Sequence, residues 1–113
     1  MEDRIILGLT EDVYIIDNDH NKKVRARIDT GAITSSIDKS LVSDLNLGPY
    51  VKTTTVVSSQ GRVERPSLFI KVNVKGKELR IRFTVADRSH MKFPMLVGQN
   101  ILKKGFLIDP NKN

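Results

Sequence analysis

Arg27-Ile28-Asp29-Thr30-Gly31-Ala32 is the stretch that decides the fold and the chemistry of this chain. Before Asp29, the apolar residues Val24, Ala26 and Ile28 alternate with basic ones, which predicts a strand with one buried face. An acid, a hydroxyl and two small residues follow, and Gly31 lets the backbone turn where a side chain would collide. The pattern predicts a carboxylate presented at the tip of a loop.

A carboxylate in this position has two interpretations. One is an ordinary strand end with an Asx-type turn, which residues of this kind also form. The other is implied by the resemblance of Asp29-Thr30-Gly31-Ala32 to the active-site signature of aspartic proteases. There, two carboxylates share one proton, so that one activates a water as general base while the other acts as the acid. The sequence holds one such motif, and a symmetric homodimer supplies the second carboxylate most simply, because each subunit contributes one Asp29.

Length and composition indicate a single domain. The 113 residues suffice for one modest core. The absence of cysteine excludes disulfides, thiolate zinc sites and cysteine nucleophiles. The N-terminus lacks the features of a signal peptide, and no apolar run approaches the roughly 20 residues that span a bilayer. We therefore expect a cytoplasmic domain with no membrane partner.

The chain is basic, with a formal net charge of +6 and a sequence pI of about 9.8. Such a charge invites a nucleic-acid interpretation. Lysine and arginine are nevertheless spread along the chain, and only four Phe and two Tyr are present to stack on bases. These features argue against nucleic acid, whereas an acidic peptide would be attracted by the same field.

Most of the remaining chain has the spacing of short strands. Two β-rich arms around a Ser/Gly tip predict one hairpin, and a second hairpin has one apolar face in each arm. One or two helical turns are expected within residues 40–47, with Asp38 as the cap, and a second helix from Gln99 to Lys104. The expected strands cover residues 5–7, 13–16, 23–28, 53–57, 62–66, 68–74, 79–85 and 106–110, with residues 10–12 linking the first two.

Asp-Thr-Gly-Ala after an apolar strand resembles the active-site signature of retropepsin-like aspartic proteases, and Leu96-Val97-Gly98 before a helix resembles their second signature. The resemblance covers nearly the whole chain and extends to the RimK-associated family labelled as an ATP-dependent zinc protease. Asp87-Arg88-Ser89 and Met91–Gly98 also fit this family, and Arg88–Leu96 is the most specific part of the resemblance. It implies an all-β fold, a retropepsin-like closed β-barrel with one or two short helices, in which residues 1–113 form a single domain that acts as a symmetric homodimer.

The resemblance also implies roles for individual residues. Asp29, Thr30 and Gly31 are the expected catalytic residues, and the Thr30 hydroxyl is expected to bond across to the partner loop. Leu96-Val97-Gly98 is expected to cross beneath this loop and support it. The hairpin at residues 53–66 corresponds to the flap that closes over bound peptide. The expected substrate-binding residues are Ala32, Ser58, Ser59, Gln60 and Gly61.

No metal and no cofactor are expected. The zinc label lacks an H-E-x-x-H motif, and His20 and His90 lie far apart in the chain. Gln99 stands where the family usually has an arginine that joins an ion-pair network near the dimer interface, so a weaker dimer is expected. Ala32 in place of a serine removes one hydrogen bond to the carboxylate, which predicts a less acidic pH optimum.

The expected function is an aspartic-type endopeptidase, in which two Asp29 carboxylates of a homodimer activate the water that hydrolyses a peptide bond. The family's association with RimK-type ATP-grasp ligases and the basic residues near the expected cleft favour acidic or glutamate-rich tails as substrates. Two alternatives stay open: a non-catalytic peptide-binding or dimerisation module on the same barrel, and a nucleic-acid barrel whose binding would fall steeply with salt. The basic residues are Arg25, Arg27, Arg62, Arg65 and Lys92.

Overall fold

A computed structural model describes residues 3–58 and 61–112 of the chain. The described residues form β-strands of widely different length, one 3-10 turn and two short α-helices. In chain order these are β1 (Ile5–Leu7), β2 (Thr10–Ile15), η1 (Asp17–Asp19), β3 (Lys22–Ile28), β4 (Ser35–Asp38), α1 (Lys39–Asp44), β5 (Lys52–Ser58), β6 (Gly61–Val74), β7 (Lys77–Ala86), β8 (Met95–Val97), α2 (Gln99–Leu102) and β9 (Phe106–Ile108).

Six strands close into a barrel. Neighbouring strands follow the order β2-β3-β8-β4-β7-β6, and a further pairing of β2 with β6 closes the ring. The pairs β3–β8 and β4–β7 are parallel, and the other pairs in the ring are antiparallel. This architecture confirms the predicted all-β closed barrel with two short helices.

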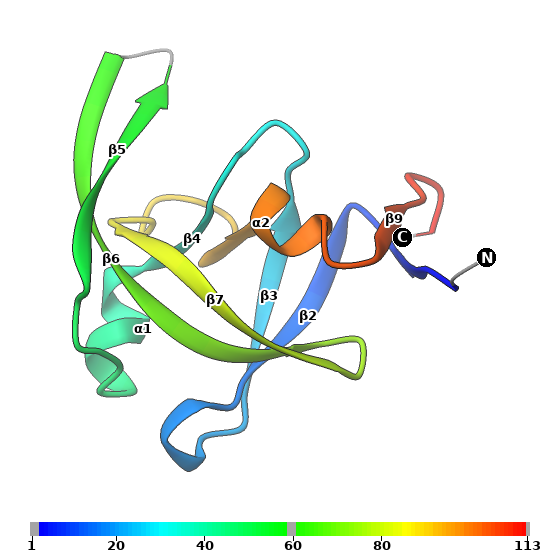
Figure 1. The fold of residues 1–113 in the computed structure, drawn as a ribbon, viewed down its shortest axis with the longest axis horizontal. Coiled ribbons are helices and arrows are strands. Elements are labelled where there is room, and N and C mark those ends of the chain that lie inside the picture. The colour runs from blue at the N-terminus through cyan, green and yellow to red at the C-terminus, as the bar shows by residue number, and fades with distance from the viewer. Residues whose placement is uncertain (1–2, 59–60, 113) are drawn as a thin grey trace.

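Two features lie outside the barrel. Strand β5 pairs only with β6, and the β5–β6 hairpin extends away from the barrel as a two-stranded arm (Figure 1). Strands β1 and β9 pair in parallel as a separate two-stranded sheet near both ends of the chain (Figure 1). The hairpin arm and the small sheet therefore both leave strand edges uncovered.

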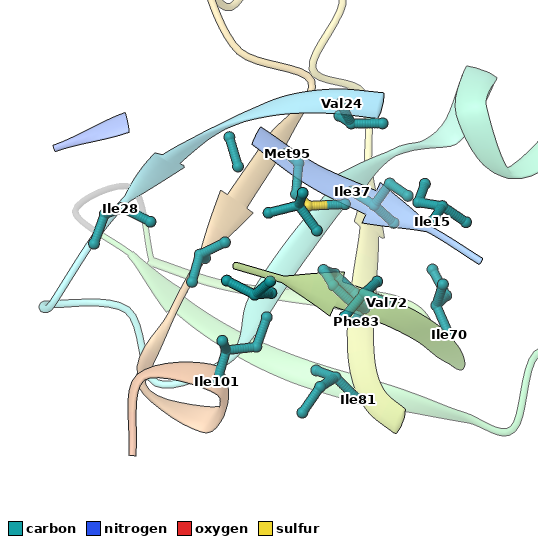
Figure 2. Packing of buried hydrophobic residues seen from close by; sticks show 14 of the residues in the cluster. Ile15, Val24, Ile28, Ile37, Ile70, Val72, Ile81, Phe83, Met95 and Ile101 are labelled. Atoms are coloured by element: carbon teal, nitrogen blue, oxygen red, sulfur yellow. The ribbon is translucent and has the colours of Figure 1, made fainter. Parts of the chain in front are cut away.

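The core forms where the period-two pattern of the strands points inward. In β3 the alternating apolar residues are buried and the basic residues between them are exposed, as predicted. Apolar side chains from β2, β4, β7 and β8, among them Ile15, Ile37, Phe83 and Met95, meet in the interior (Figure 2). Each fully buried side chain of this size contributes roughly 1.5–3 kcal/mol relative to exposure.

Two expected element boundaries are wrong. Residues 10–12 are not a linker but the first half of β2, because they pair with residues 25–27 of β3 and because the Glu11 carboxylate is buried and accepts the Gly8 N–H at 2.7 Å. Strand β6 runs unbroken through Pro66 instead of forming two strands. Pairing of β6 with β7 stops at Ser67, which leaves Pro66 at a sheet edge, where proline is tolerated.

Both helices lie where they are expected. Helix α1, Lys39–Asp44, has the expected length of one or two turns, whereas α2 ends at Leu102 rather than at Lys104. Asp38 occupies the expected N-cap position of α1, and its carboxylate accepts the hydroxyl of Ser40 in the first turn. Within residues 3–58 and 61–112, no helix has the length and apolar character needed to cross a membrane.

Candidate active site

Asp29 follows directly on the last residue of β3. The Ile28 N–H donates to the Leu9 carbonyl at 2.9 Å, and the Asp29 N–H donates to the Val97 carbonyl at 2.9 Å. Strand β3 pairs in parallel with β8, with Arg27 opposite Leu96 and Ile28 opposite Val97. The strand therefore delivers the Asp29 carboxylate to one end of the barrel, where it is half-buried.

The turn after Asp29 orients this carboxylate. The Gly31 N–H donates to Asp29 Oδ1 at 2.9 Å, and the Ala32 N–H donates to the Asp29 carbonyl at 3.3 Å. A Cβ at Gly31 would lie 3.3 Å from Asp29 Oδ1, so a larger residue would crowd the oxygen that the turn holds. Thr30 is exposed at the tip, and its predicted bond to a partner loop stays a prediction.

The Leu96-Val97-Gly98 segment lies against residues 29–34, which connect β3 to β4 and are called the Asp29 loop below. A Cβ at Gly98 would lie 2.8 Å from the Ala32 carbonyl oxygen and 2.9 Å from the Thr34 carbonyl carbon, so the close approach requires glycine. Beyond it, the Gln99 N–H donates to the Ala32 carbonyl at 2.7 Å, and the Asn100 N–H donates to the Ile33 carbonyl at 3.2 Å. The start of α2 thus fastens the backbone of the loop.

Sequence reasoning missed a set of hydrogen bonds that connects β4, just after the loop, to α2. Both the N–H and the hydroxyl of Ser35 donate to Asn100 Oδ1, at 3.0 and 2.7 Å, while Ser35 Oγ accepts the Gly98 N–H at 2.9 Å. The Asn100 side chain in turn donates to the Arg82 carbonyl at 2.8 Å. The sequence does show a serine and an asparagine, one beside each signature. It does not show that they are hydrogen-bonded to each other, because they lie 65 positions apart.

Gln99 also acts within its own chain. Its side-chain amide donates to the Thr30 carbonyl at 2.9 Å, which fixes the tip of the loop from the α2 side. Where an arginine would bring a charge, this glutamine brings a neutral donor. The substitution therefore keeps a contact to the loop and removes a charge near the expected dimer interface.

A cleft of about 310 Å³ lies between the loop and the β5–β6 hairpin. Its lining residues come from the loop, from both arms of the hairpin and from the barrel: Gly31, Ala32, Ile33, Thr34, Ser36, Thr55, Val56, Val57, Arg65, Thr84, Arg88 and Leu96. Of the predicted substrate-binding residues, Ala32 lies in this lining. Ser58 and Gly61 pair at the ends of the hairpin arms, and Ser59 and Gln60 lie outside the described residues.

Two shallower depressions adjoin the other side of the loop. One, of about 380 Å³, is lined by Asp29 and Thr30, and the other, of about 490 Å³, by Arg25, Lys92 and Phe93. Arg27 lines both of them. The guanidinium of Arg25 is engaged, because it lies 3.2 Å from Asp12 Oδ1 and donates to Thr10 Oγ1 at 2.6 Å.

The loop between β7 and β8 is anchored by a buried carboxylate. Asp38 accepts the Arg88 N–H at 2.6 Å and the Ser40 hydroxyl. Burial alone raises the pKa of the Asp38 carboxyl, but the hydrogen bonds from Ser40 and Arg88 outweigh it and hold the pKa below its ordinary value. At exposed Asp87, hydrogen bonds from the hydroxyl and N–H of Ser89 likewise lower the pKa.

Known proteins share this fold. The protease of EIAV, solved with the inhibitor HBY-793, matches with a TM-score of 0.67 and 27% identity over 91% of this chain and 88% of the other. A DUF785 protein of unknown function from Legionella pneumophila subsp. pneumophila str. Philadelphia 1 matches with a TM-score of 0.66 and 21% identity over 94% and 93%. No curated protein matches the sequence.

The family comparison covers most of the chain. The family model described as "gag-polyprotein putative aspartyl protease" matches residues 17–104, which include both signatures and the hairpin between them. The RimK-associated family is not among the comparisons that match. The chain therefore belongs to the gag-polyprotein aspartyl protease family.

Proposed function

We propose that this protein is an aspartic-type endopeptidase that works as a symmetric homodimer, with one Asp29 from each subunit. The observation that carries the proposal is the way Asp29 is held: its N–H bonds to Val97, and one carboxylate oxygen accepts the Gly31 N–H at 2.9 Å. The other carboxylate oxygen has no such bond from the turn within the described residues. A fixed carboxylate of this kind suits a partner that approaches from outside.

The second carboxylate has to come from another chain. Among the described residues that line the cleft and the two depressions, Asp29 is the one acidic residue. The exposed Asp87 is engaged by Ser89, and Asp109 accepts the Asn111 N–H at 2.9 Å. Neither lies in a glycine turn that would present it beside Asp29, so a second copy of the same loop is the simplest source.

The small sheet of β1 and β9 offers a surface for that second copy. Ile6 and Leu107 are paired across the two strands and are 48% and 54% exposed. Ile33, just after the Asp29 loop, is 76% exposed. Large apolar side chains at these levels of exposure and unpaired strand edges favour burial against another chain.

In the dimer the two Asp29 carboxyls share one proton, because two adjacent carboxylates do not both ionise readily. The ionised one takes a proton from water, and the water oxygen attacks the peptide carbonyl carbon. The protonated one gives its proton to the reacting peptide as the C–N bond breaks, which restores the shared-proton state. Ala32 offers no hydroxyl to the acids, which favours a less acidic optimum than a serine would.

Acidic or glutamate-rich peptides are the proposed substrates, with a RimK-type ligase as a functional associate. Arg27 lines the depression that contains Asp29, and Lys92 lines the second depression, which Arg27 also lines. Neither residue has an ion pair with a carboxylate in residues 3–58 and 61–112. Their uncompensated charge would attract a peptide that carries carboxylates. Arg25 contributes less, because Asp12 already neutralises it.

The test combines molecular mass with cleavage. Light scattering from micromolar to millimolar concentration should reveal a dimer, and the same samples should cleave a panel of acidic peptides between pH 4 and 7. Asp29→Asn should abolish cleavage and preserve the fold, as judged by circular dichroism, whereas Asp109→Asn should cleave like the wild type. Cleavage by Asp29→Asn would refute the mechanism. A monomer at every concentration that still binds peptide would favour the non-catalytic module, which the uncharged Gln99 also favours.

A further inference from the structure

The cleft between the Asp29 loop and the hairpin contains a buried hydroxyl with no partner. Ser36 lies in β4, is 6% exposed and lines the cleft. Its Oγ has no hydrogen-bond partner, and no other buried side-chain nitrogen or oxygen of the described residues is in this state. Buried polar atoms in folded proteins are almost always hydrogen-bonded, so an unpartnered one beside a cleft indicates a group that arrives from outside.

The same cleft contains two arginines without a counter-ion. Arg88 comes from the loop between β7 and β8 and is 9% exposed, and its Nε–H donates to the Phe93 carbonyl at 3.0 Å. Arg65 comes from β6, in the hairpin. Neither guanidinium lies within 4.0 Å of a carboxylate in the described part of the chain.

The lowered pKa of Arg88 is consistent with a guanidinium that has no counter-ion among the described residues. Burial is the main cause that lowers the pKa of Arg88, and the positive charge of Arg65 lowers it further. Asp38 opposes the shift, but its carboxylate is bound to the backbone N–H of Arg88 and not to the guanidinium. A buried cation without a paired anion is costly, so the cleft favours an anionic guest.

We infer that Ser36, Arg65 and Arg88 form a subsite that binds a carboxylate of the bound peptide. The inference rests on the proposed peptide function. The planar guanidinium of Arg88, fixed through Nε, can present its terminal N–H groups to both carboxylate oxygens, and the Ser36 hydroxyl can donate to one of them. Val56 and Leu96 in the lining provide apolar surface for the carbon stem that bears the carboxylate.

This subsite is separate from Asp29, the proposed catalytic residue. The lining of the cleft begins at Gly31 and does not include Asp29, which lines the neighbouring depression. The carboxylate would therefore belong to a residue beside the scissile bond, not to the bond itself. Ser36, Arg65 and Arg88 act as specificity-determining residues, and the carboxylate comes either from an acidic side chain or from the C-terminus of the peptide.

Binding to the Asp29→Asn variant tests the subsite without relying on cleavage. The probes are fluorescein-labelled octapeptides of alanine and leucine that carry one Glu at each position in turn, their Glu→Gln counterparts, and both series with the C-terminus amidated. Fluorescence anisotropy gives each dissociation constant. At least one probe should bind about tenfold or more tightly than its neutral counterpart, as expected for charge-assisted hydrogen bonds. Loss on Glu→Gln identifies an acidic side chain, and loss on amidation identifies the C-terminus.

Variants then assign the effect to residues. In the same Asp29→Asn background, Arg65→Gln, Ser36→Ala and Arg88→Lys should each reduce the preference for the charged probe, and Arg80→Gln, which removes an exposed guanidinium from β7, should not. Arg65→Gln and Ser36→Ala keep the test valid if Arg88→Lys disturbs the loop. Equal binding of charged and neutral probes, or an equal effect of Arg65→Gln and Arg80→Gln, would overturn the subsite. Absence of cleavage by the wild type, with the preference intact, would refute only the protease function.

Discussion

The Asp29 loop and the β5–β6 hairpin face each other across one cleft but are built in opposite ways. The loop is held by hydrogen bonds from β8, from α2 and from its own turn, and Gly98 packs against it closely enough to exclude a side chain. In the hairpin arm, the described residues 53–58 and 61–66 pair only with each other. A lone two-stranded hairpin is marginally stable in water. The comparison indicates that the rest of the fold fixes the Asp29 loop and that the hairpin arm has little besides its own pairing to fix it.

The largest effect is expected where the loop is packed most tightly. Gly98→Ala should destabilise the protein by about 1–3 kcal/mol and abolish peptide cleavage, because its Cβ would overlap the backbone at Ala32 and Thr34. Gly98 has a φ of −104°, which any residue adopts, so the effect would come from the clash alone. Urea denaturation and a cleavage assay measure the two quantities.

Gly76→Ala is the control for this experiment. Gly76 has a φ of +89° and open space around its Cβ position, so its replacement introduces backbone strain without a clash. We expect a loss of stability of about 1 kcal/mol with normal cleavage. Full activity in Gly98→Ala would show that the loop tolerates movement, and the contrast between loop and hairpin would then fail.

An intermediate effect is expected at Asp38, which anchors the loop that carries Arg88. The pKa of Asp38 is lowered in the folded protein, so at a pH just below its ordinary value the unfolded chain binds more protons than the folded one. The contribution of Asp38 to stability is therefore fully present above about pH 4 and is lost as the pH falls through the folded pKa.

Asp38→Asn should remove this pH dependence and cost about 1–3 kcal/mol at pH 7, because the hydrogen bonds to Ser40 and Arg88 lose their charged acceptor. Denaturation of both proteins from pH 3 to pH 7 provides the measurement. Asp44→Asn serves as the control, since Asp44 is an exposed residue at the end of α1. Parallel stability curves for the wild type and Asp38→Asn would contradict the assignment.

The smallest effect on stability is expected in the hairpin. Val57 is 72% exposed and lines the cleft, so Val57→Thr should change the free energy of unfolding by no more than about 0.5 kcal/mol. Peptide affinity should nevertheless fall about threefold, as expected for the loss of one apolar group of the size of a methylene from a bound interface. Thermal denaturation and anisotropy with the same labelled peptides separate the two. A large loss of stability would mean that the hairpin is as firmly built as the loop.

Much of the fold could be predicted because it is encoded in local patterns. Alternation in β3 and in the β6–β7 hairpin gave the buried faces correctly, and glycine-containing motifs marked the Asp29 loop and the segment beneath it. The errors came where a partner distant in sequence decides the state of a residue. Residues 10–12 look like a linker until β3 pairs with them. Asp38 is the N-cap residue as expected, but local sequence does not reveal that its carboxylate also accepts the Arg88 N–H, 50 positions away.

The sequence by itself therefore determined the class of the fold and the position of Asp29 at a loop, and it supplied the hypothesis of a second carboxylate. Only the tertiary structure brought Ser35 to Asn100, and Ser36, Arg65 and Arg88 to one cleft. Serine and arginine carry no periodic signal that separates a surface role from a buried one. Their roles depend on which groups surround them in the folded protein. At the surface, water satisfies a hydroxyl or guanidinium, whereas a buried one without a partner costs free energy.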